Sequence, residues 1–240
     1  MKFLFIVGYG SKHDNLELRY SLRSIEKYGT GIEEVYCAGQ PPSWFQPSRN
    51  ALTLDFILNP GRNRNIQHNV VQGVKHFNIT EDFILGIDDV FLLRKTDFAL
   101  YPRYIEAYEL PRQGSGNNGW KCAMVDTGRW LRAKGYPSLN FMTHAHCRLN
   151  GSVILRHFGE IEHSIHHSDR GLEIVSQVGN ITLAENPKLP LVLRRDNKLG
   201  EVFDISGIDD CFSISDKTFS DPRLMKFLES EYPNKSRWED

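Results

Sequence analysis

One stretch indicates the fold more clearly than any other: Thr80-Glu-Asp-Phe-Ile-Leu-Gly-Ile-Asp-Asp-Val-Phe-Leu-Leu-Arg-Lys-Thr-Asp97. Residues 83–87 form a short apolar run that one glycine interrupts, which is typical of a strand buried on both faces of an α/β sheet. Asp88 and Asp89 end this run, and residues 90–93 are apolar again. We therefore predict that the two acids lie at the end of a buried strand, where open α/β sheets bind ligands.

The paired acids also predict a metal. Adjacent carboxylates repel each other, and they are costly near apolar surface unless a cation neutralises them. Mg²⁺ or Mn²⁺ suits such a pair, because hard divalent ions take oxygen ligands and are often shared with substrate phosphates. We expect Asp88 and Asp89 to bind the ion, with Asp89 also acting in catalysis. The alternative is that Asp-Asp only forms the turn after the strand.

The composition indicates a soluble globular protein with a full core. The chain has 240 residues, of which 40% are hydrophobic and 11% aromatic, and its formal net charge is -1. Such a charge creates no overall field that would attract nucleic acid. No apolar run approaches the roughly 20 residues that span a bilayer, and residues 2–7 are too short for a signal-peptide core. We therefore expect a cytoplasmic protein without a membrane span.

The first hundred residues alternate between predicted strands and helices. Strands are predicted at 2–7 and 34–38, an extended segment at 51–58, and helices at 15–28 and 63–77, which is the order of an α/β protein. Asp14 and Glu17 have the spacing of a capping box at the first helix. Gly8 and Gly10 match the first two glycines of a dinucleotide fingerprint. His13 stands where the third glycine is needed, so NAD is not expected.

Two arginines, Arg62 and Arg64, begin the helix predicted from residue 63. The N–H groups of a helix N-terminus are not bonded within the helix, and with two guanidinium groups they would form a phosphate site. The alternative is an exposed polar first turn.

The second half of the chain has fewer clear patterns. Helices are predicted at 101–110 and 222–232, and a helix or a strand-helix pair at 120–134. Residues 111–119 form a glycine-rich loop that could act as a lid. His144 and His146 alternate within the segment 140–148, so on a strand they would point to one face. There they could bind metal or transfer protons. Both are candidate catalytic residues, and His144 is a candidate third metal ligand. Two surface histidines on a strand would show the same pattern.

Several segments carry a resemblance to a known family. Three segments resemble the second conserved block of the Stealth proteins, which are sugar-phosphate transferases of capsule synthesis. These segments are Glu17-Leu-Arg-Tyr-Ser-Leu-Arg-Ser-Ile-Glu-Lys-Tyr28, Pro42-Ser-Trp44 and Asp88-Asp89. More broadly, the chain resembles short glycosyltransferase-like proteins of phages and of bacterial surface-polysaccharide clusters. Those proteins similarly carry a Trp-to-Gly-Tyr-Pro segment (120–137 here), a Thr-His pair (143–144) and a terminal Pro-Asn-x-Ser-Arg-aromatic-Glu motif (233–239).

The resemblance implies a GT-A-like, Rossmann-like α/β domain with a mixed central sheet flanked by helices. A single domain would span residues 1–240, with a nucleotide-binding half at 1–100 and an acceptor-binding half at 101–240. It implies a metal-dependent glycosyltransferase that moves a sugar from a nucleotide-diphosphate sugar, expected to be a UDP-sugar, to a hydroxyl acceptor. Mn²⁺ or Mg²⁺ would lie at the Asp pair, Tyr9 and Arg19 on the nucleotide side, and Arg62 and Arg64 at the phosphates.

Two alternatives remain: Stealth-type transfer of a sugar 1-phosphate, and a non-catalytic module that binds a sugar nucleotide or nucleic acid. Stealth proteins have an acidic Trp-Val-Asp motif after the first strand, where this chain has Val7-Gly-Tyr-Gly-Ser11, which favours release of a nucleoside diphosphate. A glycan hydroxyl is the expected acceptor, and a hydroxymethylated DNA base is the rival. DNA would need a basic track. The candidates for that track are Arg129, Arg132, Lys134, Arg148, Arg194, Arg195 and Lys198.

Overall fold

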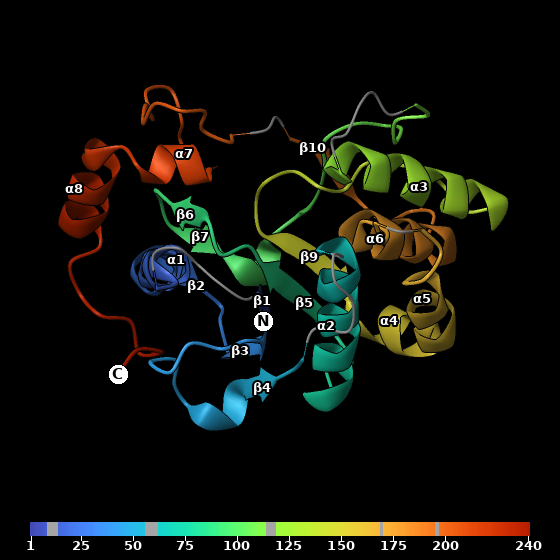
Figure 1. Ribbon diagram of the computed structural model, residues 1–240, viewed down its shortest axis with the longest axis horizontal. Helices are drawn as coiled ribbons and strands as arrows, with labels where there is room; N and C mark the ends of the chain where they lie inside the picture. The colour runs from blue at the N-terminus through green and yellow to red at the C-terminus, as the bar shows by residue number, and fades with distance from the viewer. Residues whose placement is uncertain (9–13, 56–61, 114–118, 169, 195–196) are drawn as a thin grey trace.

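The computed structural model describes residues 1–8, 14–55, 62–113, 119–168, 170–194 and 197–240 (Figure 1). Its centre is a five-stranded mixed sheet in the order β4-β3-β1-β5-β9. Four strands are parallel and β9, at one edge, is antiparallel to β5. The strands are β1 (Lys2–Val7), β3 (Glu34–Gly39), β4 (Ala51–Thr53), β5 (Asp82–Gly86) and β9 (Cys147–Asn150). The prediction of an α/β protein with a mixed central sheet is confirmed.

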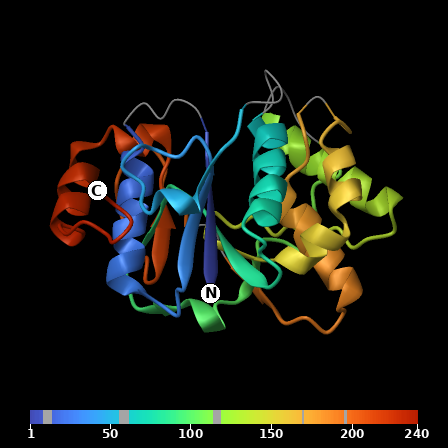
Figure 2. The ribbon, with the colours of Figure 1, turned by 90° about the horizontal axis from the view of Figure 1, so that it is seen from below.

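Helices cover both faces of this sheet (Figure 2). On one face lie α2 (Arg62–His76), α4 (Gly151–Arg156), α5 (Phe158–Ser164) and α6 (Ile174–Glu185), with α3 (Gly119–Ala133) packed on α6. On the other face lies α1 (Leu16–Tyr28). Successive side chains of a strand point to opposite faces. Accordingly Phe3 and Phe5 pack in the core with α1, whereas Leu4 packs in the core with α2. Both faces of β1 are therefore buried, which explains its continuous apolar sequence.

A further group of elements packs beside α1. It consists of an antiparallel pair, β6 (Val90–Leu92) and β11 (Cys211–Ser213), with α7 (Asp216–Phe219) and α8 (Pro222–Glu231). Its core contains Phe91, Phe212, Leu224 and Tyr232, all buried. Two short parallel pairs complete the sheets: β2 (Gly29–Thr30) with β7 (Thr96–Asp97), and β8 (Arg103–Ile105) with β10 (Leu191–Leu193). Residues 48–50 and 98–100 are 3-10 turns.

The predicted strands at 2–7 and 34–38 and the predicted helices at 15–28, 63–77, 120–134 and 222–232 are confirmed within a few residues. The helix predicted at 101–110 is wrong, because Arg103–Ile105 is a strand paired with Leu191–Leu193. That partner lies far along the chain, so no local pattern could indicate it. The capping box at the first helix is also wrong: its N-cap is Asn15, in the left-handed region and without a side-chain cap bond.

The strand order reverses beside β1. The chain runs from β1 to β3 and β4 on one side and then crosses to β5 on the other side (Figure 1). The carboxyl ends of β1 and β5 therefore lie next to each other at one edge of the sheet. In open α/β sheets this switch point is where ligands bind. Asp88 and Asp89 lie there, because they follow β5 directly.

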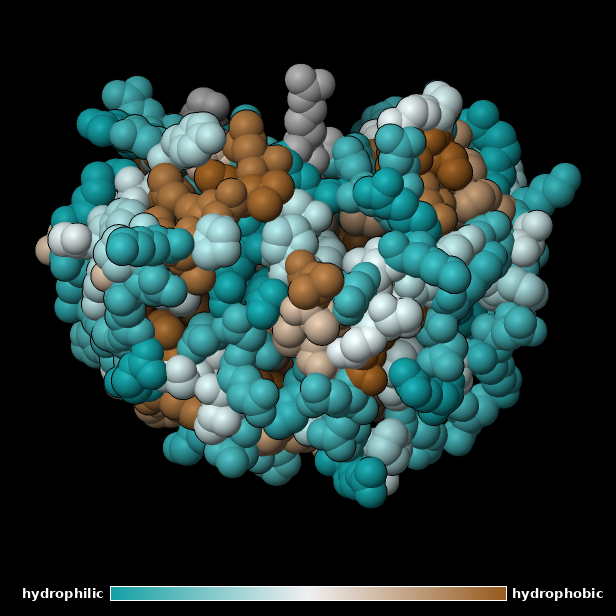
Figure 3. All heavy atoms as spheres, turned by 180° about the vertical axis from the view of Figure 1, so that it is seen from behind, coloured by the Kyte–Doolittle hydropathy of each residue, from teal (hydrophilic) through white to brown (hydrophobic). Residues whose placement is uncertain are grey.

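The exposed apolar residues form several separate patches on the described surface. On the face opposite to that of Figure 1, hydrophilic residues separate the exposed apolar atoms (Figure 3). Within the described part of the chain, no helix is both long and apolar enough to cross a bilayer.

Candidate metal and phosphate site

The Asp pair forms the turn between β5 and β6. The amide of Val90 donates to the carbonyl of Ile87 across 3.3 Å, which closes the turn around the two acids. Asp88 is exposed and Asp89 is half-buried. Strands fix both ends of the turn, since β6 pairs with β11 and β5 lies inside the central sheet.

Three segments distant in sequence hold this turn in place. The Ser21 hydroxyl donates to the Val90 carbonyl at 2.8 Å. The Ile87 amide donates to His146 Nδ1 at 3.2 Å. The Ile214 amide donates to the Asp89 carbonyl at 3.2 Å. A backbone held in this way limits the positions that its side chains can take when a ligand binds. The backbone of the two acids is therefore preorganised.

Charged side chains around the turn shift the pKa values of both acids. Asp88 is exposed at its surface, but the surrounding protein still partly desolvates its carboxylate. This desolvation and the nearby Glu17 carboxylate raise the pKa of Asp88 against the opposing charge of Arg62. Burial and Asp88 raise the pKa of Asp89 to about 7, although the charges of Lys198 and Arg62 lower it. The negative charges of Glu17 and the Asp pair thus exceed the positive charges of Arg62 and Lys198. Ionisation of both Asp88 and Asp89 is therefore unfavourable.

This donor set fits a hard divalent ion. Oδ1 of Asp89 is buried and finds no hydrogen-bond partner in the described part of the structure. A buried carboxylate oxygen without a partner is costly, and a cation would relieve that cost. Two carboxylates are enough where a ligand's phosphates complete the coordination shell. Among the described residues, no group of three or more His, Cys, Asp or Glu side chains is arranged to hold a metal, so Asp88, Asp89 and His144 are not brought together as predicted.

Metal binding at this pair should depend on pH. Because the Asp89 pKa is raised to about 7, the carboxylate must lose a proton before it can bind Mn²⁺. The apparent affinity for Mn²⁺ should therefore rise by about tenfold per pH unit below pH 7 and level off above it. Calorimetric titration of the protein with Mn²⁺ across this range measures the slope. A flat profile would show that Asp89 does not bind the ion.

The two histidines have different environments. The expectation that they share one face of a strand is wrong, because residues 141–146 are not a strand and His144 has a φ of 45°. The His144 ring lies 6.0 Å from that of Trp120 and is partly accessible. The His146 ring is fully buried, with edge contacts to Phe3 and Phe5. Burial and Arg194 lower the pKa of His146 to about 3, so it stays neutral. His146 thus supports the turn rather than contacting a ligand.

The two arginines of the α2 N-terminus also separate. Arg62 is exposed, and its charge acts on both acids. Arg64 donates through Nε and Nη2 to the carbonyl of Ser168, the Nε bond measuring 2.8 Å. Those donors join α2 to the segment after α5 instead of facing the Asp pair. Of the two predicted phosphate ligands, the structure brings only Arg62 to the acids.

The predicted nucleotide-side residues are Tyr9 and Arg19. Tyr9 lies outside the described residues, as do Arg195 and most of the predicted lid. The Arg19 guanidinium lies 4.6 Å from the Trp44 ring centre, and its Nε is 3.7 Å from the Glu239 carboxylate. The segments 17–28, 42–44 and 233–239, which carry the family resemblance, therefore meet in the fold. Arg19 is part of that packing.

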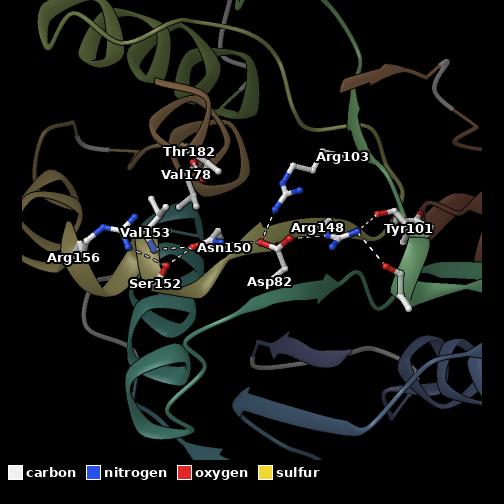
Figure 4. Close-up of polar contacts among 11 residues, drawn as sticks. Asp82, Tyr101, Arg103, Arg148, Asn150, Ser152, Val153, Arg156, Val178 and Thr182 are labelled. Carbon is white, nitrogen blue, oxygen red and sulfur yellow. Dashed lines mark hydrogen bonds and ion pairs between the residues drawn. The ribbon is translucent and has the colours of Figure 1, made fainter. Parts of the chain in front are cut away.

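A second polar cluster lies at the opposite end of β5 (Figure 4). Asp82 accepts hydrogen bonds from Arg103, from Arg148 Nε at 3.0 Å and from Asn150 at 2.8 Å. An open cavity of about 320 Å³ adjoins it. Arg194, elsewhere, is buried and pairs with Asp210. Half-buried carboxylates thus pair with Arg148 and Arg194, two residues of the basic track expected for DNA.

Glu17 and Lys198 were not assigned to the site from the sequence. Glu17 seemed to cap a helix, and Lys198 is separated from the Asp pair by more than a hundred residues. Only the position of α1 and of β11 brings their charges to the acids.

No family model matches the chain, and no curated protein matches it.

Proposed function

We propose that the protein is a metal-dependent glycosyltransferase with a GT-A-like nucleotide-binding half. It would transfer a sugar from a nucleotide-diphosphate sugar, with a UDP-sugar as the expected donor, to a hydroxyl acceptor. The observation that carries this proposal is the Asp pair at the switch point of the sheet, where a buried Asp89 oxygen has no hydrogen-bond partner among the described residues and the charge of Arg62 acts on both acids. The Asp carboxylates can bind a metal ion, and the nearby Arg62 can bind phosphate. Together they suit a ligand that consists of a metal ion and a diphosphate.

Asp88 and Asp89 would hold Mn²⁺ or Mg²⁺, which when bound supplies positive charge to the departing diphosphate. Arg62 would bind a phosphate oxygen by a charge-assisted hydrogen bond. The acceptor hydroxyl forms a bond to the anomeric carbon, the bond from that carbon to the diphosphate oxygen breaks, and the hydroxyl proton passes to a base. The sequence names His144 as the candidate for that base, and its ring is partly accessible and lies next to Trp120.

Product analysis by mass spectrometry tests the reaction type. The protein is incubated with Mn²⁺ and UDP-, GDP-, ADP- and CDP-sugars, with polysaccharide and hydroxymethylated DNA offered side by side. We expect a nucleoside diphosphate and a glycosylated polysaccharide. A nucleoside monophosphate would instead indicate sugar-1-phosphate transfer, and a product on DNA alone would overturn the glycan acceptor. Tight binding of a sugar nucleotide without any product would indicate the non-catalytic module.

The two arginines of α2 should behave differently when mutated. Replacing Arg62 with Ala should raise the donor dissociation constant by about one to two orders of magnitude, as expected for a lost charge-assisted hydrogen bond. Arg64→Ala is the matched control, since Arg64 bonds to the Ser168 carbonyl, and it should leave donor affinity nearly unchanged. Equilibrium binding of the donor with Mn²⁺ measures both. Equal losses in the two variants would contradict the assignment.

A further inference from the structure

A continuous chain of hydrogen bonds links five residues that line the open cavity beside Asp82 (Figure 4). Arg103 donates through Nη2 to Asp82, and the Asn150 amide donates to the same carboxylate oxygen at 2.8 Å. The Asn150 oxygen accepts from the Ser152 hydroxyl at 2.7 Å, and that hydroxyl accepts from Arg156 Nη1 at 3.0 Å. The chain therefore holds two arginines along one wall of the cavity, with three polar residues between them.

The acceptors of this chain are bonded, whereas donors remain available. Asp82 also accepts from Arg148 Nε at 3.0 Å, so both of its oxygens have partners. The Arg103 guanidinium bonds to Asp82 and to no other described residue, and none of its nitrogens belongs to the buried polar atoms that lack a partner. The remaining N–H groups of Arg103 are therefore accessible from the cavity that this residue lines.

Positive charge exceeds negative charge beside this cavity. Asp82 pairs with both Arg103 and Arg148, and Arg156 pairs with Glu185, so three guanidinium groups face two carboxylates. Burial raises the pKa of Asp82, but the charge of Arg103 and the hydrogen bonds outweigh it and lower the pKa, so this carboxylate is ionised at neutral pH. The surplus charge favours an anion, and the planar guanidinium fork matches a carboxylate or a phosphate.

The rest of the lining suits a sugar. Ser152, Thr182 and Asn186 carry hydroxyl and amide groups, and Val153 and Leu189 add apolar surface. The volume of about 320 Å³ is at the lower end of the roughly 300–1,000 Å³ that small-molecule sites occupy. The cavity therefore has room for one small ligand with both polar and apolar groups.

We propose that this cavity binds a small anionic sugar, a monosaccharide that carries a carboxylate or a phosphate. The anionic group bonds to the accessible N–H groups of Arg103 and Arg156, and the sugar hydroxyls bond to the polar side chains of the lining. The site is separate from the Asp pair, because Asp82 begins β5 and the pair follows the other end of that strand. The inference therefore does not depend on the proposed function.

Calorimetric titration in EDTA tests this site without the metal. The probes are glucuronate and glucose 6-phosphate, which distinguish a carboxylate from a phosphate, and glucose is the uncharged comparison. We expect at least one of the charged sugars to bind, and glucose to bind at least tenfold more weakly, because it forms no charge-assisted hydrogen bond with an arginine.

Arg103→Gln should weaken binding of the charged sugar by about tenfold or more. Arg156→Gln should weaken it by a smaller factor, because the Arg156 side chain is 55% exposed and its charge is better screened by water. Arg129→Gln is the matched control, since Arg129 is exposed on α3, pairs with Asp126 and should bind the sugar as the wild type does. The unfolding temperature of each variant shows whether it is folded.

Three results would overturn the inference. They are no binding of either charged sugar to the wild-type protein, binding of glucose as tight as that of the charged sugars, and a loss in Arg129→Gln equal to that in the cavity variants. If Arg103→Gln does not fold, Arg156→Gln decides, because an exposed side chain can be replaced without loss of the fold. An unchanged affinity in that variant would then place the ligand elsewhere.

Discussion

Asp89→Asn should reduce turnover by on the order of a thousandfold and abolish metal-dependent donor binding. The amide keeps the shape of the side chain but cannot bind a divalent ion as a carboxylate does. The fold should remain, because burial and Asp88 already make the ionised Asp89 unfavourable, as its raised pKa shows. We therefore expect the metal-free variant to unfold at the same temperature as the wild type or at a higher one.

The comparison needs a control acid and a chelator. Asp204 is exposed, so Asp204→Asn removes one surface carboxylate without touching the site and should retain full activity. Wild-type activity should disappear in EDTA and return with Mn²⁺. Full activity of Asp89→Asn, or wild-type activity that survives EDTA, would contradict the metal assignment.

Arg23→Ala should lower the free energy of unfolding by on the order of 3 kcal/mol. Arg23 donates to the Glu239 carboxylate through Nε at 2.9 Å and Nη2 at 2.8 Å, and the Glu239 side chain is fully buried. Burial alone would raise the Glu239 pKa, but hydrogen bonds from Arg23 and from the Ser236 backbone outweigh it and hold the pKa below its ordinary value. Removing Arg23 leaves much of this buried charge without compensation.

Urea denaturation measures the loss. The control is Arg237→Ala, because Arg237 pairs with Glu26 at the surface and should contribute less than about 1 kcal/mol. If Arg23→Ala loses no more stability than this control, the buried ion pair does not join α1 to the C-terminal segment.

The sequence predicts those parts of the fold that depend on local periodicity. β1, α1, β3, α2 and β5 follow from apolar spacing, and the Asp pair was placed correctly at a strand end because a continuous apolar run stops there. The strand β8 could not be predicted, since its partner β10 lies about ninety residues away. Pairing, rather than local preference, determines this segment.

The candidate site was less predictable than the fold. Arg62 and Arg64 look equivalent in the sequence, but only the fold shows that Arg64 bonds to a carbonyl. His146 resembles a ligand until its burial is known. Glu17 and Lys198 carry no motif, and their charges reach the acids only through tertiary packing. A charged side chain can serve an internal partner or a ligand, and local sequence does not distinguish the two.

Metal-dependent binding of a sugar nucleotide is the central claim, and a thermal-shift screen tests it most directly. The wild-type protein is heated with each of a set of nucleotide sugars, first with Mn²⁺ and then with EDTA. A ligand that binds only the folded protein raises its unfolding temperature. We predict that at least one nucleotide sugar, expected to be a UDP-sugar, raises this temperature with Mn²⁺ and has no effect with EDTA. No shift with any of them, or equal shifts with and without the metal, would contradict the account.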